Sequence, residues 1–366
     1  MKILSITPAY APAIGGIETV VHELAKRLPA LGHEVHVAHV HTSHRRLVTE
    51  QHDGVTVHRV PLRGHRLLGL APDLGKIASE YDVLHVHDPQ LMAITASVRL
   101  FAGQVPAVLS THGGFHHTQR LSGFKRMFER LALAHALNHY RAVLASSVTD
   151  QTYFQRFSNR VRLCSNGVAT DKFGRVPIEN DRDMLRWVYW GRLSVNKRVD
   201  LVIQAVAQAH GAGLPVQLLV CGRDPDGLAE GLHKQVNRLG LSDSVVFKTH
   251  MSDEELLSEL ASRGVYVTAS EHEGFGLSVV EALSAGLLVM CRDMEPLSTF
   301  ITPGLTGQFL AFEDGPGDLD SFHWLKSMSS AQRAQSRIES RAQAALHSWG
   351  SAVEVFDSEL RAAAMC

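Results

Sequence analysis

The sequence lacks any apolar run long enough to cross a membrane. A spanning helix needs ~20 consecutive apolar residues, and no window of the chain approaches that length. The opening MKILSIT has too short an apolar stretch for a signal peptide, because Pro8 and Pro12 follow it directly. We therefore expect a cytoplasmic protein, and leave open a peripheral contact with the inner face of the cell membrane.

The sequence also has few cysteines and no excess of charge of either sign. The sequence has four cysteines, at Cys164, Cys221, Cys291 and Cys366, and they form no CxxC pair. Three of the four lie in apolar runs, which indicates buried thiols in a reducing compartment. The 36 Lys and Arg residues balance 37 Asp and Glu residues, for a formal net charge of -1. Such a balance gives no overall field that would favour nucleic acid, so we expect no nucleic-acid partner.

What the chain does contain is a regular alternation of short β-branched runs with helical periods. This alternation is typical of α/β domains with parallel sheets, and nearly all-apolar runs indicate strands buried on both faces. The 366 residues suit two such domains better than one. The predicted strands form two series, at 2–7, 34–41, 55–60, 82–87, 106–111 and 141–146, then at 185–191, 216–221, 245–248, 265–268 and 287–291.

The polar stretch 171–183 separates the two series and is the best candidate for a linker. It predicts two domains and a terminal helix, at residues 1–175, 176–345 and 346–366. The terminal helix has one apolar face, formed by residues at helical spacing: Trp349, Val353, Phe356 and Leu360. We expect this helix to pack back on the first domain.

The strongest chemical signal is the segment Glu273-Gly-Phe-Gly-Leu-Ser-Val-Val-Glu281, which follows a predicted strand and opens a helix. A glycine-rich turn from strand to helix presents backbone N–H groups and the positive helix end to an anion. Glu273 lies in the loop and Glu281 about one turn into the helix, so one carboxylate can reach a sugar hydroxyl and the other a ribose. An acidic helix N-terminus would explain the carboxylates alone, but not Gly274 and Gly276 between them.

A second signal is the basic segment 191–198, Gly-Arg-Leu-Ser-Val-Asn-Lys-Arg, which follows the first strand of the second series. Side chains at the carboxyl end of a parallel strand face the ligand crevice of such folds. Arg192 can bind a phosphate bidentately, and Lys197 supplies a second positive charge. The alternative is a solvated basic turn. Together with the Glu273 loop, the segment predicts a pocket for a diphosphate sugar.

With these motifs the sequence resembles glycosyltransferase family 4, a large group of retaining enzymes with the GT-B fold. The resemblance spans nearly the whole chain and includes Gly15-Gly-Ile-Glu18 after the first strand. It implies two Rossmann-like domains facing a central cleft, the first for the acceptor and the second for the nucleotide sugar. Arg192 and Lys197 would then neutralise the diphosphate. Glu281 would hold the ribose, and Glu273 the transferred sugar. Further positions would line the donor pocket: Gly15, Gly16, Gly274, Phe275, Gly276, Leu277 and Ser278.

A third segment, 110–118, places His112 at the carboxyl end of a predicted strand. A His at this position of the family contacts the donor sugar near the reacting carbon. The His112-Gly-Gly-Phe version is similar to that of bacterial exopolysaccharide α-mannosyltransferases of the acetan and xanthan type. This likeness implies that the enzyme transfers a hexose, and that the hexose is mannose from GDP-mannose. The acceptor would be a lipid-linked or soluble glycan in cell-surface polysaccharide biosynthesis, and no separate cofactor would be needed.

Other functions stay open from the sequence alone. A UDP-sugar-dependent glucosyl- or N-acetylglucosaminyltransferase, a nucleotide-sugar epimerase of the same fold and a silent sugar-nucleotide binder would each contain such a pocket. Family members of this fold use positive side chains in place of a metal. Several residues at strand ends resemble a metal-binding cluster in composition: His85, His87, Asp88, His112 and His116. Their spacing at strand ends does not fix the geometry that metal ligands need, so we expect no metal there.

The segment 124–131 carries an apolar stripe with basic residues on either side. It predicts either a core-facing helix with a solvated basic face or a surface that meets anionic lipid. The basic residues of the segment are Lys125, Arg126 and Arg130. A lipid-facing surface could extend to Arg59, Arg63 and Arg66.

Overall fold

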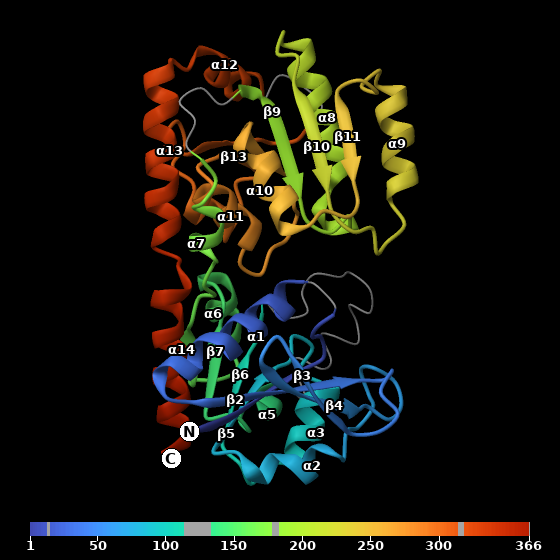
Figure 1. Cartoon of the computed structure of the whole chain (residues 1–366), viewed down its shortest axis with the longest axis vertical. Coiled ribbons are helices and arrows are strands. Elements are labelled where there is room, and N and C mark those ends of the chain that lie inside the picture. Colours follow the sequence, from blue (N-terminus) through green and yellow to red (C-terminus); the bar gives the residue numbers. More distant parts are fainter. Residues whose placement is uncertain (13–14, 113–132, 178–182, 314–317, 366) are drawn as a thin grey trace. The chain divides into compact units, whose positions relative to one another are not determined.

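The computed structural model describes residues 1–12, 15–112, 133–177, 183–313 and 318–365, and it divides the chain into two compact units (Figure 1). Unit 1 comprises Met1–Gly167 together with Trp349–Cys366, and unit 2 comprises Val168–Ser348. Each unit is built on one sheet with helices on both faces. The two parallel-sheet α/β units that the sequence predicts are therefore confirmed.

The limits of the units differ by a few residues from the 175/176 and 345/346 expected from the sequence. Helix α7 (Thr170–Phe173) packs against helix α11 (Leu277–Ser284). The backbone N–H of Val168 also donates to the carbonyl of His347 at 2.9 Å. These contacts place the start of the polar stretch in unit 2, since they hold it against that unit's own core.

Unit 1 contains an eight-stranded sheet in the order β3-β4-β2-β1-β5-β6-β7-β8. Among the described pairs, β3 and β4 are antiparallel and the others are parallel. The strands are β1 (Lys2–Thr7), β2 (Glu34–His41), β3 (Val48–His52), β4 (Val55–Pro61), β5 (Val83–His87), β6 (Ala107–Ser110), β7 (Ala142–Ala145) and β8 (Val161–Leu163). The helices are α1 (Gly16–Arg27), α2 (Leu74–Ile77), α3 (Ala93–Phe101), α5 (Ala134–Leu137), α6 (Val148–Gln155) and α14 (Trp349–Ala364).

Unit 2 contains a six-stranded sheet in the order β11-β10-β9-β12-β13-β14, with parallel pairs throughout. Its strands are β9 (Asp183–Trp190), β10 (Gln217–Cys221), β11 (Val245–Lys248), β12 (Arg263–Thr268), β13 (Leu288–Cys291) and β14 (Gly307–Phe309). Besides α7 and α11 its helices are α8 (Val199–Gly211), α9 (Ala229–Arg238), α10 (Asp253–Ala261), α12 (Leu319–Ser327) and α13 (Ser330–Ala345).

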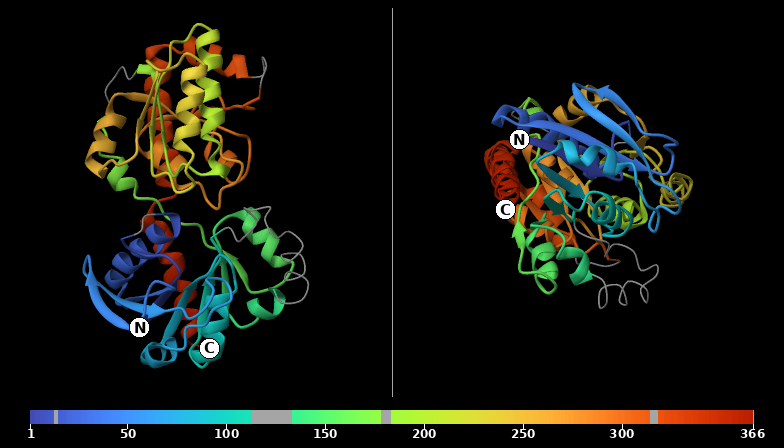
Figure 2. Two further views of the ribbon diagram at one scale, coloured as in Figure 1. Left: turned by 90° about the vertical axis from the view of Figure 1, so that its right-hand side faces the viewer. Right: turned by 90° about the horizontal axis from the view of Figure 1, so that it is seen from below.

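The two faces of the unit 2 sheet carry separate cores. Helices α8 and α9 cover one face, and α11 and α13 cover the other (Figure 2). Alternate residues of β9 enter the two cores, so Trp187 lies with α8 whereas Val188 and Trp190 lie with α11. A strand that is buried on both faces must be apolar at almost every position, which is why the sequence predicts these strands well.

All eleven predicted strands are present, and the structure adds three that the sequence analysis missed: β3, β8 and β14. Across the described residues, no helix is both long and apolar enough to cross a bilayer. The predicted lipid-facing segment 124–131 lies outside the described residues. Arg59 does not extend a basic surface, because its guanidinium donates to Glu50 at 2.7 Å and its side chain is only 12% exposed.

The last helix, α14, packs on the unit 1 sheet against β5 and β6 and beside α1 (Figure 1). A buried polar contact fixes its position along the sheet. The ring of His33, whose side chain is fully buried, lies 2.5 Å from Asp357 of α14, and Arg361 donates both to Asp357 at 2.8 Å and to the carbonyl of Leu31 at 2.9 Å. Burial acts to raise the pKa of the Asp357 carboxyl, but the hydrogen bonds from Arg361 and His33 outweigh it and lower the pKa.

We expect Asp357→Asn to lower the free energy of unfolding by about 1–3 kcal/mol at pH 7, because it leaves the buried His33 and the partly exposed Arg361 with a weaker acceptor. Urea unfolding at several pH values measures the effect. A carboxyl with a lowered pKa in the folded state stabilises above its unfolded pKa of about 3.9 and loses that contribution as the pH falls through its folded value. The difference from wild type should therefore shrink below about pH 4. Glu354→Gln, at an exposed position of the same helix, is the control. An equal loss in both variants would contradict the assignment.

Candidate active site

The carboxyl ends of β9 and β12 lie side by side because these strands are neighbours in the unit 2 sheet. The segment 191–198 follows β9, and the segment 269–276 follows β12. Parallel neighbours deliver their following loops to the same edge of a sheet, where open α/β folds bind ligands. Two of the motifs that the sequence singles out therefore meet within one unit.

The turn after β9 is tight. Gly191 and Gly222 both have φ near +150°, at +151° and +150°. A Cβ on Gly222 would come within 1.7 Å of the Gly191 carbonyl oxygen, so this close approach requires glycine. The turn leaves the Arg192 side chain exposed, with no ion-pair partner among the described residues. Its guanidinium is accordingly free to bind an anion.

Lys197 and Glu273 form an ion pair across the two loops, with 2.5 Å between Nζ and Oε1. The two side chains are only 16% and 12% exposed. Little water can therefore solvate either charge, and each depends on the other for compensation. The pair joins two residues that the sequence analysis assigns to the transferred sugar and to its diphosphate.

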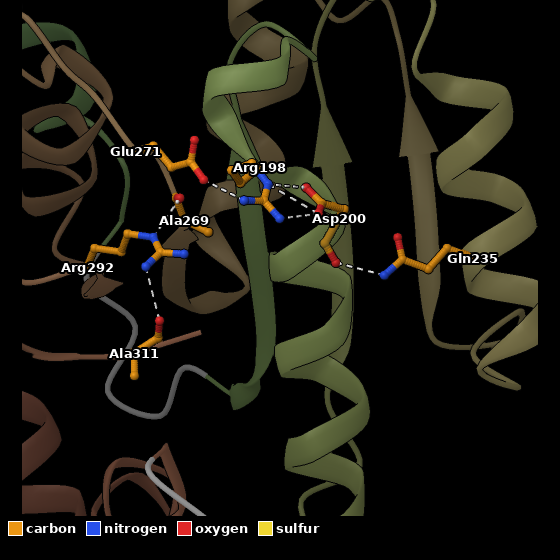
Figure 3. Close-up of polar contacts among 7 residues, drawn as sticks. All are labelled: Arg198, Asp200, Gln235, Ala269, Glu271, Arg292 and Ala311. Atoms are coloured by element: carbon orange, nitrogen blue, oxygen red, sulfur yellow. Dashed lines mark hydrogen bonds and ion pairs between the residues drawn. The ribbon is translucent and has the colours of Figure 1, made fainter. Parts of the chain in front are cut away.

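Further contacts hold the two loops in register. The backbone N–H of Glu271 donates to the Asn196 carbonyl at 2.9 Å. Arg198 lies between two carboxylates, with 2.5 Å to Glu271 and 2.8 Å to Asp200 (Figure 3). Arg198 takes a left-handed backbone conformation with φ of +47°, which turns the chain into α8. The loop that carries Glu273 is thus fixed by main-chain and side-chain contacts.

The start of the same loop is also held by Arg292, which follows β13. Its guanidinium donates to the carbonyl of Ala269 at 3.2 Å and to that of Ala311 at 3.1 Å (Figure 3). Arg292 therefore connects the segment after β12 with the segment after β14. The start of the loop that carries Glu273 is thus anchored to neighbouring strands, through Ala269 by Arg292 and through Glu271 by Arg198.

Helix α11 begins at a glycine that no other residue could replace without strain. Gly276 has φ of +91°, and a Cβ there would lie 2.5 Å from the Leu297 side chain. Phe275 is buried, with its ring 5.3 Å from that of Phe300. Of the predicted donor-pocket positions, Phe275 thus packs in the core and has only its backbone groups available. Leu277 and Ser278 open the helix and are partly exposed.

Glu281, in the second turn of α11, accepts a hydrogen bond of 3.0 Å from the indole N–H of Trp190. Burial raises the pKa of the Glu281 carboxyl, and the Trp190 hydrogen bond acts in the opposite direction. Trp190 is the last residue of β9, directly before Gly191. The contact therefore links Glu281 to the turn that carries Arg192.

The remaining predicted site residues belong to unit 1. Gly15 precedes α1, and its carbonyl accepts from the backbone and the hydroxyl of Thr19 at 3.0 and 2.9 Å. A Cβ on Gly15 would lie 2.6 Å from a carboxylate oxygen of Glu18, so a side chain there would require the flexible Glu18 carboxylate to move. Gly16 is the first residue of the helix.

His112 lies two residues beyond β6 in a left-handed conformation with φ of +51°. Its Nε2 is 2.8 Å from Nδ1 of His87, and the two rings stack at 5.1 Å. His85 continues the row, with its ring 4.0 Å from that of His87. Desolvation lowers the pKa of His112 to about 4, so its imidazole is neutral at pH 7. The contact with His87 leaves Nδ1 of His112 for another partner.

No group of three or more His, Cys, Asp or Glu side chains within the described ranges is arranged to hold a metal ion. Asp88 instead accepts hydrogen bonds from the backbone and the hydroxyl of Thr95, at 3.0 and 2.8 Å. His116, which the sequence analysis groups with these possible metal ligands, lies outside the described residues.

The sequence analysis does not single out Trp190, and it names His87 only among the residues that resemble a metal cluster, without its contact with His112. Trp190 sits at the carboxyl end of a central strand, a place that signals a role at the ligand edge. His87 shares one face of β5 with His85, and this spacing is visible in the sequence. Neither signal reveals the hydrogen bond itself, which depends on how the helix or loop opposite is placed.

Comparison with known proteins identifies the family. Residues 14–172 match the model described as Glycosyltransferase Family 4, and residues 172–319 match the one described as Glycosyl transferases group 1. A GDP-mannose:cellobiosyl-diphosphopolyprenol alpha-mannosyltransferase from Xanthomonas campestris is 30% identical, over 99% of this chain and 97% of that protein. The enzyme of the same name from Komagataeibacter xylinus is 30% identical, over 84% of this chain and 79% of that protein.

Solved structures share the fold at lower identity. The Anabaena protein HepE in complex with UDP and glucose has a TM-score of 0.77 and 19% identity, over 99% of this chain and all of that one. Sucrose-phosphate synthase from Thermosynechococcus elongatus has a TM-score of 0.73 and 20% identity, over 98% of both chains. The chain belongs to glycosyltransferase family 4, and it is a glycosyltransferase with the GT-B fold.

Proposed function

We propose that this glycosyltransferase moves mannose from GDP-mannose to a lipid-linked oligosaccharide, with retention of the anomeric configuration, in the biosynthesis of a cell-surface polysaccharide. The contact of Lys197 with Glu273 beside the exposed Arg192 carries the proposed chemistry. Two cations and a carboxylate at one strand edge suit a diphosphate bound to a sugar. The choice of GDP-mannose rests on the relatives with 30% identity, whose names specify that donor and a diphosphopolyprenol acceptor.

Donor binding would rearrange the charges of the site. A diphosphate beside Lys197 competes with Glu273 for the ammonium group, and the carboxylate so released can accept hydrogen bonds from sugar hydroxyls. Arg192 has no ion pair to give up, so it can bind the phosphate oxygens bidentately. Backbone N–H groups at the start of α11, from Gly274 to Ser278, add a positive end to the same pocket. Glu281 takes the ribose.

The transfer step needs no covalent nucleophile. The bond between C1 of the sugar and the phosphate oxygen breaks while the acceptor oxygen bonds to C1 on the same face. The leaving phosphate oxygen takes the acceptor proton. Negative charge grows on the diphosphate during this step, and Arg192 and Lys197 stabilise it mainly in the transition state. In our proposal the neutral imidazole of His112 contacts the transferred sugar, Gly15 and Gly16 approach the donor diphosphate, and the rest of unit 1 binds the acceptor.

Peripheral contact with an anionic membrane would suit a lipid-linked acceptor. It stays a prediction from the sequence, because the basic segment 124–131 lies outside the described residues.

The donor prediction is tested by transfer to polyprenyl-diphosphate cellobiose. We expect an α-linked mannose product from GDP-mannose and little product from UDP-glucose or UDP-N-acetylglucosamine with the same acceptor. Release of free nucleotide without any acceptor would indicate the epimerase instead. Tight binding of UDP with none of GDP would refute the donor assignment.

Arg192 and Lys197, which together form the proposed diphosphate clamp, are tested by the substitutions Arg192→Ala and Lys197→Ala. Each should lower kcat/KM by roughly 10²-fold or more, as the loss of a preorganised charge does. Arg192→Ala removes an exposed, unpaired side chain, so its stability should stay within about 0.5 kcal/mol of wild type. Lys234→Ala, which breaks an exposed ion pair on α9, is the matched control and should keep full activity. Near-normal turnover in either clamp variant would overturn the pocket assignment.

Metal independence is tested with EDTA. Because side chains neutralise the diphosphate in this mechanism, activity should survive the chelator. Complete loss of activity that one divalent ion restores would contradict the mechanism.

A further inference from the structure

Trp190 is the one aromatic side chain of β9 that reaches a proposed donor-binding carboxylate. It ends the strand, is 8% exposed and donates its indole N–H to Oε2 of Glu281 at 3.0 Å. The two residues are 91 positions apart in the sequence, so the contact depends on the packing of β9 against α11.

Neighbouring rings fix the orientation of the Trp190 indole. Phe173 of α7 stacks on it with 6.1 Å between ring centroids and 11° between ring planes. Tyr266 of β12 lies 4.4 Å from it at 58°. A ring confined by both neighbours cannot turn its N–H away from Glu281 without displacing them. The direction of this hydrogen bond is therefore set by three elements of unit 2.

Tyr266, one of these neighbouring rings, also contacts a second residue near the start of α11. The hydroxyl of Tyr266 donates to the Ser278 hydroxyl oxygen at 2.8 Å. Trp190 and Tyr266 thus place two polar groups beneath successive turns of the helix, both aimed at predicted donor-pocket residues. The indole N–H of Trp187, on the opposite face of β9, instead donates to the carbonyl of Met184 at 3.0 Å.

The surroundings of Glu281 leave its charge dependent on this contact. Burial disfavours its ionised form. The other charged groups that act on it, Lys172 of α7 and Asp253 of α10, have opposite effects and pair with each other at 2.7 Å. Tyr266 faces it from β12 as a neutral phenol, since burial strongly raises the pKa of that hydroxyl. The Trp190 N–H is the neutral donor that favours the carboxylate.

We propose that Trp190 is a positioning residue for nucleotide binding: its indole N–H orients the Glu281 carboxyl group to accept hydrogen bonds from the vicinal hydroxyls of the donor's ribose. The inference rests on the proposed function, in which Glu281 binds the ribose. It adds that affinity for the nucleotide, rather than the transfer step, depends on a side chain beneath the pocket.

The test compares the binding of GDP and of 2′,3′-dideoxyguanosine diphosphate by calorimetry. Trp190→Phe keeps a stacked ring and removes the N–H. We expect its Kd for GDP to rise about five- to tenfold, the effect of losing one ordinary hydrogen bond. Its Kd for the dideoxy compound should stay within about twofold of wild type. Trp187→Phe makes the same change on the same strand without touching Glu281, and should leave both constants unchanged.

A pH series separates positioning from mere packing. Without the N–H, the pKa of Glu281 rises further, so the acidic limb of GDP binding should move to higher pH in Trp190→Phe. It should not move in Trp187→Phe. If Trp190→Phe does not fold, β-(3-benzothienyl)alanine at position 190 keeps the bicyclic shape and replaces the N–H with sulfur.

The outcomes distinguish the proposed role of Glu281 in ribose binding from the proposed role of Trp190 in positioning it. If wild type binds both diphosphates equally, Glu281 does not hold a ribose, and the proposed role of that residue fails. If wild type prefers GDP and Glu281→Gln removes the preference, but Trp190→Phe keeps it with an unmoved acidic limb, the inference about Trp190 is wrong. Loss of the preference in both variants supports it.

Discussion

The ion pair between Lys197 and Glu273 is the constraint on which the rest of the site depends. Two charges that are less than one-fifth exposed need each other, because breaking such a pair leaves an uncompensated charge at a cost of several kcal/mol. The pair can form only if the loops after β9 and β12 lie side by side, which the parallel sheet order ensures. It also places a cation and a carboxylate where a diphosphate sugar would meet both.

The surrounding contacts serve to hold that pair and to aim its neighbours. Arg198 ties the two loops through Glu271, and Arg292 ties the second loop to the strands beyond. Gly276 allows α11 to start against Leu297, so the helix presents its N-terminus and Glu281 at the same edge. A rigid edge of this kind suits catalysis by preorganised charge, since the charges need not be rearranged as the transition state forms.

How far the sequence predicts this arrangement depends on the kind of feature. Strands such as β9 and β12 are predicted because both faces are buried, which forces an apolar run. Strand β3 is missed because it is a polar, largely exposed edge strand, and β14 because three residues give no period. The meeting of Lys197 with Glu273 follows from the rule that parallel strands share a carboxyl edge. The hydrogen bond of Trp190 does not follow from any pattern, because it depends on the rotation of α11 and on a side-chain rotamer.

A crystal structure of the protein with GDP-mannose, or with GDP, tests the central claim most directly. The account predicts diphosphate oxygens within hydrogen-bond distance of Lys197 and Arg192, with the Lys197–Glu273 pair loosened and the ribose hydroxyls on Glu281. A nucleotide bound elsewhere, or a diphosphate at this edge with the ion pair intact and Arg192 pointing into solvent, would contradict it.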